Sequence, residues 1–567
     1  MKNIILLLTG LLLVFSISCT EDYDEINQQP DALSVSDVSA KYFVTTLQQK
    51  LYRDNVFELW YGRILHSDMF AGHFSGGHSA YAWAGDFAWN YWNALTDGGS
   101  WGPYAAYNST LTSYLNLVGE GGTLENEQYY ALGLVMKSLY YHAFTDQFGA
   151  IPFSQASDPD IKLPVYDDQI DVYKGVIADL DQAISIIGSN TSTGEGVDLL
   201  GENDVIFNGD MQNWKKLANS LKLRIALRAH GSPGEDFSAT VATQAIASGV
   251  LADTDALLEG YAEETTIWGD GSTSYGDVWH TWPTARWKMA EPLVNILKAD
   301  NDPRLAIMSK PIKGGSVTVS IVPRDGETDA LVQKHLTFLK STLDDAGLVL
   351  DTDYTWTETA DELTITMTEG THYVGLPSRM NGKLQKYFNT DLFSDPAENL
   401  TQKVNQGKPV LPSVIMSAGD THFMIAEAIL RGLASGDAAS YYQSGLRKAM
   451  AHWETISGVS LDESNMGALT GTTEEQLEKV ATQRWIANYT NSIEAWAIVR
   501  DTGYPSSAVS TSSDDDIISL AGPLNGAYPN RLRYGSGVYN SNQANVEAAV
   551  AKQGPDVMAT RLWFASE

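Results

Sequence analysis

Residues 420–453 read DTHFMIAEAILRGLASGDAASYYQSGLRKAMAHW, and their spacing predicts a helical hairpin. Apolar residues recur at three- and four-residue steps in each half, which places them on one face of each helix. They are Phe423, Ala426 and Leu430 in the first half and Leu446, Met450 and Trp453 in the second. A hairpin of this length matches one tetratricopeptide-like repeat, which buries its apolar face only when further repeats stack on it. The alternative is two packed helices in an α-protein of another kind.

The ends of this hairpin carry their own signals. Asp420 or Thr421 can cap the first helix, because a side-chain oxygen there accepts from the free backbone N–H groups. Glu427 and Arg431 are four residues apart, in the order that favours an ion pair on a helix surface. Gly432 stands where helices commonly turn left-handed and end.

Length and composition limit the class of protein. The 567 residues are enough for about two to four domains or one long helical array. Hydrophobic residues make up 43% and charged residues 19%, which is typical of a globular chain. The chain has 37 Lys plus Arg against 70 Asp plus Glu, a formal charge of −33. That field repels a phosphate backbone, so we expect no nucleic-acid partner.

The first residues predict export. Lys2 is followed by an apolar run over residues 4–14 and then by small residues up to Cys19, the one cysteine of the chain. A basic start, a short apolar core and a small-residue end are typical of a secretory signal. The cysteine at its end resembles a bacterial lipobox, in which it is lipidated and becomes the first residue. The alternative is ordinary cleavage beside an incidental cysteine.

These features give the expected organisation of the chain. We expect a signal peptide at residues 1–18, a lipidated acidic tether at 19–35 and a helical domain over 36–567. Helical periodicity is clear over residues 128–144, 173–184 and 214–228, and Thr473 with Gln476 suggests a capping box. Residues 317–322 and 363–367 alternate like strands, so we expect a small β-containing insertion at about 315–375.

Several segments together resemble the SusD/RagB family of outer-membrane lipoproteins, in its SusD-like branch. They occur in the family's order along almost the whole chain: residues 19–27, Thr145 to Phe153, Trp214 to Arg228, Asp302 to Leu305, Ala426 to Ala428, Trp496 to Pro505, Asn530 to Tyr534, Asn542 to Asn545 and Thr560 to Phe564. Many of these residues define the fold in the family. We therefore interpret Asp146, Glu427 and Arg500 as helix-end and interhelix anchors rather than ligand contacts.

The resemblance implies a mainly α fold, a tetratricopeptide-like helical-repeat scaffold with an irregular loop subdomain and a small β insertion. It also implies a lipid-anchored protein on the outer face of the outer membrane, paired with a SusC-type TonB-dependent barrel. Such a lipoprotein binds a nutrient and delivers it inward, with no cofactor and no covalent chemistry. The expected cargo is a glycan, and an oligopeptide is the alternative.

Two aperiodic, aromatic-rich stretches have the composition of a sugar-binding surface, which needs rings as platforms and polar groups at the edge. Rings in such sequence are expected to be exposed. The candidate ligand-binding residues are Phe74, Tyr81 and Trp83 in the first stretch, and Trp268, Asp270, Tyr275, Asp277, Trp279, Trp282 and Trp287 in the second. The alternative is that these rings fill the core or contact the barrel.

Three other functions compete with this interpretation. A glycoside hydrolase needs two carboxylates at a set separation, which the sequence neither shows nor excludes. His66, Asp68, His73 and His78 lie close together and could converge on a metal, although they form no zinc signature. A helical solenoid can also serve only to bind other proteins.

Overall fold

The structure is a computed structural model. It describes residues 38–52, 59–76, 103–260, 275–281, 287–324, 326–368, 370, 372–378, 380–402, 410–509, 514–517, 524 and 527–565. The expected signal peptide, Cys19 and the acidic tether lie outside these ranges. Among the described residues, no helix combines the length and the apolar character that crossing a membrane requires.

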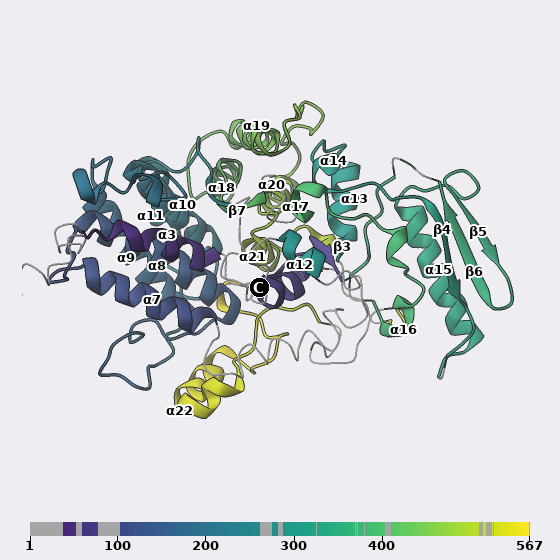
Figure 1. Ribbon diagram of the computed structural model, residues 1–567, viewed down its shortest axis with the longest axis horizontal. Coiled ribbons are helices and arrows are strands. Elements are labelled where there is room, and N and C mark those ends of the chain that lie inside the picture. Colours follow the sequence, from purple (N-terminus) through teal and green to yellow (C-terminus); the bar gives the residue numbers. More distant parts are fainter. Residues whose placement is uncertain are drawn as a thin grey trace, which may run out of the picture.

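One half of the molecule is a stack of helices (left in Figure 1). It contains α3 (Lys41–Tyr52), α7 (Pro103–Val118), α8 (Glu127–Phe148), α9 (Gln169–Ile187), α10 (Met211–Ala229) and α11 (Ser238–Ser248). The three long helices predicted from periodicity are therefore confirmed as α8, α9 and α10. Asn126 begins α8 and Asp210 begins α10, because each side chain accepts hydrogen bonds from two backbone N–H groups of the first turn.

The predicted hairpin is confirmed as α18 (Ala418–Leu430) and α19 (Ala438–Ser457), at the top of the molecule in Figure 1. Its first helix begins earlier than expected, because Ser417 Oγ, rather than Asp420 or Thr421, accepts from a backbone N–H, that of Asp420. Gly432 has the expected left-handed conformation, with φ 75°. The Glu427–Arg431 pair forms at 2.8 Å, but Glu427 is only 1% exposed, so the expected surface pair is in fact a buried one.

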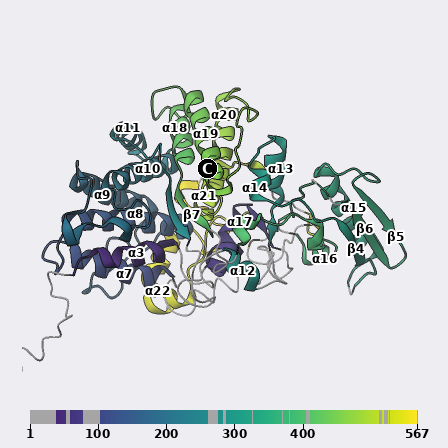
Figure 2. The same cartoon turned by 45° about the horizontal axis from the view of Figure 1, so that its top comes forward.

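Two further helices complete the scaffold, α20 (Thr473–Ala487) and α21 (Ser492–Thr502). The capping box of α20 is made by Thr472 and Glu475, one residue before the predicted pair. Successive helices pack as α8 with α9, α10 with α11, α18 with α19 and α20 with α21. Figure 2 shows the same arrangement from a second direction. The fold is mainly α and has the predicted tetratricopeptide-like architecture.

Shorter elements link this scaffold to the rest of the chain. The helical ones include a π-helix (Trp60–Ser67), α5 (Asp68–Phe70), α12 (Tyr275–Thr281), α13 (Glu291–Ala299), α14 (Leu305–Met308), α16 (Gly382–Gln385), α17 (Glu398–Thr401) and α22 (Ser536–Gln553). Helical structure continues from Trp60 to Phe70 in the π-helix and α5. Two antiparallel pairs join distant segments: β1 (Phe74–Ser75) with β3 (Lys288–Met289), and β2 (Ala256–Gly260) with β7 (Val410–Met416).

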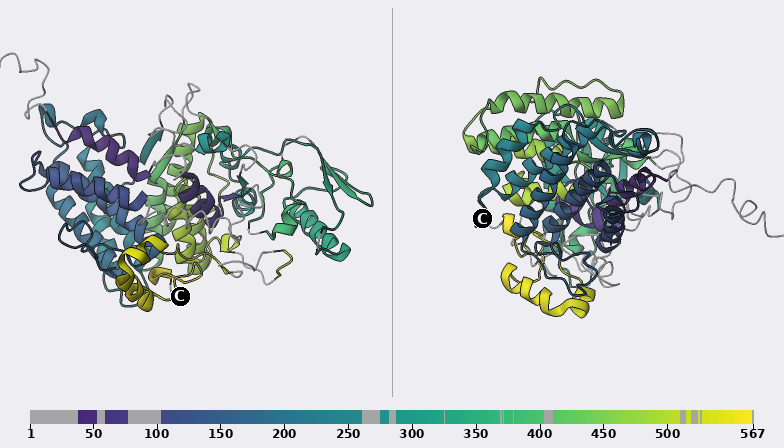
Figure 3. Two further views of the ribbon diagram at one scale, coloured as in Figure 1. Left: turned by 60° about the horizontal axis from the view of Figure 1, so that its bottom comes forward. Right: turned by 90° about the vertical axis from the view of Figure 1, so that its left-hand side faces the viewer.

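The β insertion forms a lobe at the other end of the molecule (Figures 1 and 3). Its three-stranded antiparallel sheet has the order β4 (Gly315–Ser320), β6 (Glu362–Met367), β5 (Tyr354–Glu358). The two predicted strands correspond to β4 and β6. β5 and the helix α15 (Asp329–Asp345) were not predicted. The buried residues Val332, Leu336 and Leu339 of α15 share a core with Leu363 and Ile365 of β6.

Candidate ligand-binding site

The two aromatic-rich stretches meet in space. β1 and β3 pair antiparallel, with Phe74 opposite Met289 and Ser75 opposite Lys288. The Ala290 N–H also donates to the His73 carbonyl at 3.0 Å. The chain thus brings residues near position 74 beside residues near position 289, and α12 lies next to this junction (Figure 1).

Five rings form a cluster at this junction: Phe74, Tyr275, Trp279, Trp287 and Tyr489, here called the aromatic cluster. Trp279 and Trp287 meet edge to face with ring centroids 5.0 Å apart, and Phe74 lies 6.2 Å from Trp287 and 5.4 Å from Tyr489. Such edge and tilted contacts are the favoured geometry for aromatic pairs. Tyr489, which follows the end of α20 far along the chain, was not among the predicted site residues.

The expectation that these rings are exposed is wrong for the four that the structure describes. Phe74, Tyr275, Trp279 and Trp287 are 0%, 7%, 5% and 3% exposed. Large rings gain the most from burial, and here each one packs against the others and against the scaffold. The four rings are therefore part of the packed core at this junction.

The other predicted contacts remain untested. Tyr81 and Trp83, Trp268 and Asp270, and Trp282 lie outside the described residues, and for Asp277 only the backbone position in α12 is described. The described residues next to these segments nevertheless belong to the aromatic cluster or to its elements: β1 precedes residue 77, α12 separates residues 274 and 282, and Trp287 follows residue 286.

A buried carboxyl supports the base of the site. The Tyr275 hydroxyl donates to Asp68 Oδ2 at 3.1 Å, and Asp68 is fully buried. Burial raises the pKa of Asp68 to about 6, although the Tyr275 hydrogen bond and the charge of Arg63 oppose the shift. Asp68 therefore takes up a proton at a higher pH than an ordinary aspartate does.

The histidine and aspartate group proposed as a metal site does not converge in the described residues. The buried His73 ring packs on Trp485 at 4.7 Å, and the buried His66 ring packs on Phe70 at 5.7 Å. Burial lowers the pKa of His73 to about 3, so its ring is neutral at pH 7. His78 lies outside the described ranges. The His66 and His73 rings therefore pack against other rings, and Asp68 accepts the Tyr275 hydrogen bond.

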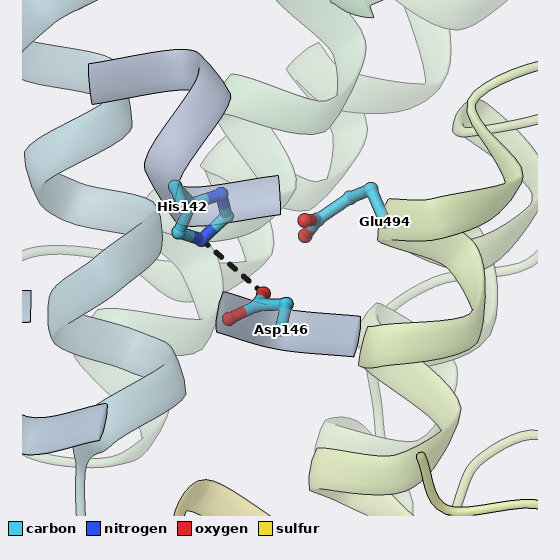
Figure 4. A group of neighbouring side chains, drawn as sticks. All are labelled: His142, Asp146 and Glu494. Carbon is cyan, nitrogen blue, oxygen red and sulfur yellow. Dashed lines mark ion pairs between the residues drawn. The ribbon is translucent and has the colours of Figure 1, made fainter. Parts of the chain in front are cut away.

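Within the described part of the chain, the single cluster with metal-ligand spacing is His142, Asp146 and Glu494. Figure 4 shows them facing one another from α8 and α21, with His142 Nε2 3.4 Å from Asp146 Oδ2. Arg228 forms ion pairs with both carboxylates, at 2.5 Å from Asp146 and 2.7 Å from Glu494. The positively charged guanidinium of Arg228 lies where a metal ion would have to bind, so these three residues belong to an ion-pair network.

This network joins five helices and confirms the three predicted anchors. Asp146 of α8 pairs with Arg228 of α10, and Glu427 of α18 pairs with Arg484 of α20 at 2.8 Å. Arg500 of α21 donates to the Asp146 carbonyl at 2.7 Å. Further ion pairs connect the same helices: Arg224 with Asp420, Arg484 with Asp420, and Arg484 with Glu494.

Neighbouring charges act differently on two carboxyl groups of this network, Glu494 and Asp501. Burial acts to raise the pKa of Glu494, but Arg224, Arg228 and Arg484 outweigh it and hold that pKa well below its ordinary value. Burial raises the pKa of Asp501 to about 7, because Arg431 and Arg228 compensate it only in part. This ion-pair network stabilises the helical scaffold on which the aromatic cluster lies.

Comparison with known proteins assigns the family. A family model described as "Starch-binding associating with outer membrane" matches residues 34–321 and 357–534. The chain belongs to the SusD-like family. The SusD-like match leaves out residues 322–356, which contain α15. No curated protein matches the chain.

Solved structures agree with this assignment at the level of the fold. A chitin-binding SusD homologue from Flavobacterium johnsoniae has a TM-score of 0.66 and 19% identity, covering 93% of this chain and 99% of its own. A SusD homologue from Bacteroides uniformis has a TM-score of 0.66 and 22% identity, with coverage of 93% and 99%. A further chitin-binding protein has a TM-score of 0.67 and 21% identity, with coverage of 93% and 100%. The SusD-like fold therefore spans nearly the whole chain.

Proposed function

We propose that this SusD-like chain captures glycans at the cell surface and passes them to a SusC-type, TonB-dependent barrel in the outer membrane. The observation that carries the proposal is family membership over most of the chain, because the family is described as starch-binding and associated with the outer membrane. Two structural relatives are named as chitin-binding, which supports the same ligand class. The protein binds its cargo without cleaving it.

The aromatic-rich segments supply the contacts in this proposal. Sugar rings present apolar C–H faces edged by hydroxyls, so aromatic faces and polar side chains hold them together. The proposed contacts are Tyr81, Trp83, Trp268, Asp270, Asp277 and Trp282. The buried rings Phe74, Tyr275, Trp279 and Trp287 hold in place the described residues from which these segments lead.

Anchoring completes the proposal. Lipidated Cys19 attaches the acidic tether of residues 19–35 to the outer membrane, with the folded domain facing the exterior. Several acyl chains on one residue hold a folded domain durably, whereas a single chain does so only reversibly. Tethering beside the barrel raises the effective concentration of the two proteins for each other.

Substitution of the proposed platform rings tests the assignment. Trp83→Ala and Trp282→Ala are each expected to weaken glycan binding about tenfold or more, because each loses a stacking face. Trp356→Ala is the matched control, since Trp356 lies on β5 in the insertion lobe, where its Nε1 donates to Glu358. Titration calorimetry with starch and chitin oligosaccharides provides the measurement.

Two results would overturn this assignment. If both site variants bind every glycan as tightly as Trp356→Ala does, the platform is elsewhere. If oligopeptides bind in place of all tested glycans, the ligand class is wrong.

A further inference from the structure

A pocket of about 580 Å³ lies between α7, α8, α22 and the segment that joins α8 to α9. In Figure 3, α22 is the yellow helix at the edge of the helical half. None of the pocket's lining residues belongs to the aromatic cluster or to the segments proposed to bind glycan. Its volume falls within the range of about 300–1,000 Å³ that is typical of small-molecule sites.

The lining combines rings with uncharged polar groups. Tyr140, Tyr141, Phe144 and Tyr166 supply the rings, and the polar side chains are amides and hydroxyls from α7, α22 and the connecting segment. Among the residues that the structure describes, no carboxylate lines the pocket, although the chain has 70 acidic residues. Lys162 is the one charged residue of this described lining, and its side chain is exposed. This chemistry disfavours a cation and suits a neutral, hydroxyl-rich ligand.

Hydrogen bonds fix the polar side chains of the pocket, and two of these side chains still have a hydrogen atom to donate. The Tyr141 hydroxyl donates to Asn108 Oδ1 at 3.0 Å, and Asn108 Nδ2 donates to Ser157 Oγ at 2.9 Å. Thr112 Oγ1 donates to the same oxygen at 2.7 Å. Because Ser157 Oγ accepts twice, its own hydrogen is left to donate, and the Asn108 amide retains a second N–H. A saccharide hydroxyl can accept from both.

Two backbone irregularities occur in the wall of this pocket. Ser157 has φ 75°, a left-handed conformation that residues with a side chain seldom adopt. Asn542 has φ −145° and ψ 44° inside α22, and its Nδ2 donates to the Pro164 carbonyl at 2.7 Å. The left-handed conformation of Ser157 is the unfavourable one of the two, and such conformations concentrate at binding sites, because the surrounding structure must hold functional groups in place.

We infer that this pocket is a second saccharide site, which takes a neutral sugar of about one to three units. This inference rests on the proposed function only for the ligand class, because the pocket contains none of the residues proposed to contact glycan. Its rings receive the apolar faces of the sugar, while Asn108, Ser157 and neighbouring hydroxyls bind the sugar hydroxyls. A small site apart from the aromatic-rich segments gives the protein a second hold on a glycan, which raises avidity for long chains.

A pocket-filling variant tests this inference. Ser109→Trp introduces a large ring on the face of α7 that lines the pocket, at an exposed position. Asn116→Trp is the matched control, because Asn116 is exposed on the same helix and does not line the pocket. The probes are maltotriose, cellotriose and chitotriose. Titration calorimetry measures affinity, and hydrogen-exchange mass spectrometry locates the bound sugar.

The inference predicts that at least one trisaccharide binds Asn116→Trp as it binds the wild type and binds Ser109→Trp about tenfold more weakly or worse. The same sugar is expected to slow amide exchange in residues 150–166 and 536–553. Equal affinity of the two tryptophan variants, or no protection of either segment by any probe, would overturn the inference.

Trp282→Ala separates this inference from the proposed function. If Trp282→Ala abolishes trisaccharide binding while Ser109→Trp leaves it unchanged, the pocket inference fails and the proposed function stands. If Ser109→Trp alone weakens binding, the pocket is the sugar site and the proposed platform is wrong. If neither trisaccharides nor polymeric glycans bind any of these proteins, both proposals fail.

Discussion

Buried charge is the main feature at the scale of single residues. Arg228 is 1% exposed and pairs with two carboxylates from different helices. The sequence motifs identified Asp146, Glu427 and Arg500 as anchors, but they did not identify the partners. Arg228 and Glu494 are 266 positions apart, and a single sequence contains no signal that joins residues at such a distance. The partners are determined by how the helices pack.

Removal of Arg228 is expected to destabilise the scaffold strongly. Arg228→Met should lower the free energy of unfolding by about 3–5 kcal/mol, because it leaves Asp146 and Glu494 buried with less compensation. Lys216→Met on the exposed side of the same helix should change it by less than about 0.5 kcal/mol. Urea unfolding measures both. Equal effects of the two substitutions would show that the network contributes little.

Asp68 is expected to make stability depend on pH. Its pKa is raised from 3.8 to about 6 in the folded protein, so the folded state binds a proton that the unfolded state has lost. The stabilisation is fully present below pH 3.8 and is lost as the pH rises through about 6. The difference in unfolding free energy between wild type and Asp68→Asn should therefore fall over this window.

Urea unfolding of both proteins at a series of pH values measures this difference. Groups other than Asp68 titrate alike in the two proteins, so their contributions cancel. A difference that stays constant, or that grows as the pH rises, would contradict the raised pKa.

At the scale of elements, long amphipathic helices were predictable and short elements were not. α9 and α19 have the 3.6-residue apolar period of a helix that packs on one face. α8 and α10 were also predicted, although they are buried around most of their surface. β1 and β3 are two residues long and exist because each has the other as a partner. Cap positions shifted by one to three residues, since Ser417 and Thr472 compete with neighbours of similar chemistry.

A glycine sets how closely the hairpin helices approach. A Cβ on Gly445 would lie 2.5 Å from a ring carbon of Phe423, so the ring packs directly on the backbone of α19. Gly445→Ala should gain about 1 kcal/mol of helix propensity and lose about 1–3 kcal/mol through overpacking. We therefore expect a net loss of stability, measured by urea unfolding.

Ser444→Ala is the control for that substitution, because the neighbouring residue is only half-buried on the same helix. It should leave stability nearly unchanged. If Gly445→Ala is more stable than the wild type, the Phe423 ring is able to move away, and the close approach is not required.

At the scale of the whole molecule, the helical scaffold and the β insertion have separate hydrophobic cores. The family model matches the scaffold and omits residues 322–356, which include α15. Figure 1 shows this lobe at the opposite end from α7–α11. The insertion was predictable from the alternating residues of β4 and β6. Its helix α15 was not predicted, because many polar residues lie between its apolar positions.

The candidate site was predictable only in outline. Composition identified both aromatic-rich stretches, and the β1–β3 pair places their described ends together. Burial was not predictable, because rings such as Trp279 and Trp287 have the same sequence context whether they face a ligand or each other. The pocket between α7 and α22 had no sequence signal, since its lining comes from distant segments.

Lipidation is a testable property of the whole chain. In a bacterial host that lipidates such signals, the wild type should incorporate radiolabelled palmitate and fractionate with the outer membrane. Cys19→Ser should incorporate none and should be released, because the tether then lacks its acyl chains. Equal labelling of the two proteins, or wild-type protein free in the cytoplasm, would contradict the proposed anchor.

Glycan capture without cleavage is tested by titrating the mature domain with a panel of neutral glycans and then chromatographing the recovered sugar. We expect saturable binding of at least one glycan, with the sugar recovered at its original length. Failure of every glycan to bind, or recovery of shortened sugar, would contradict it.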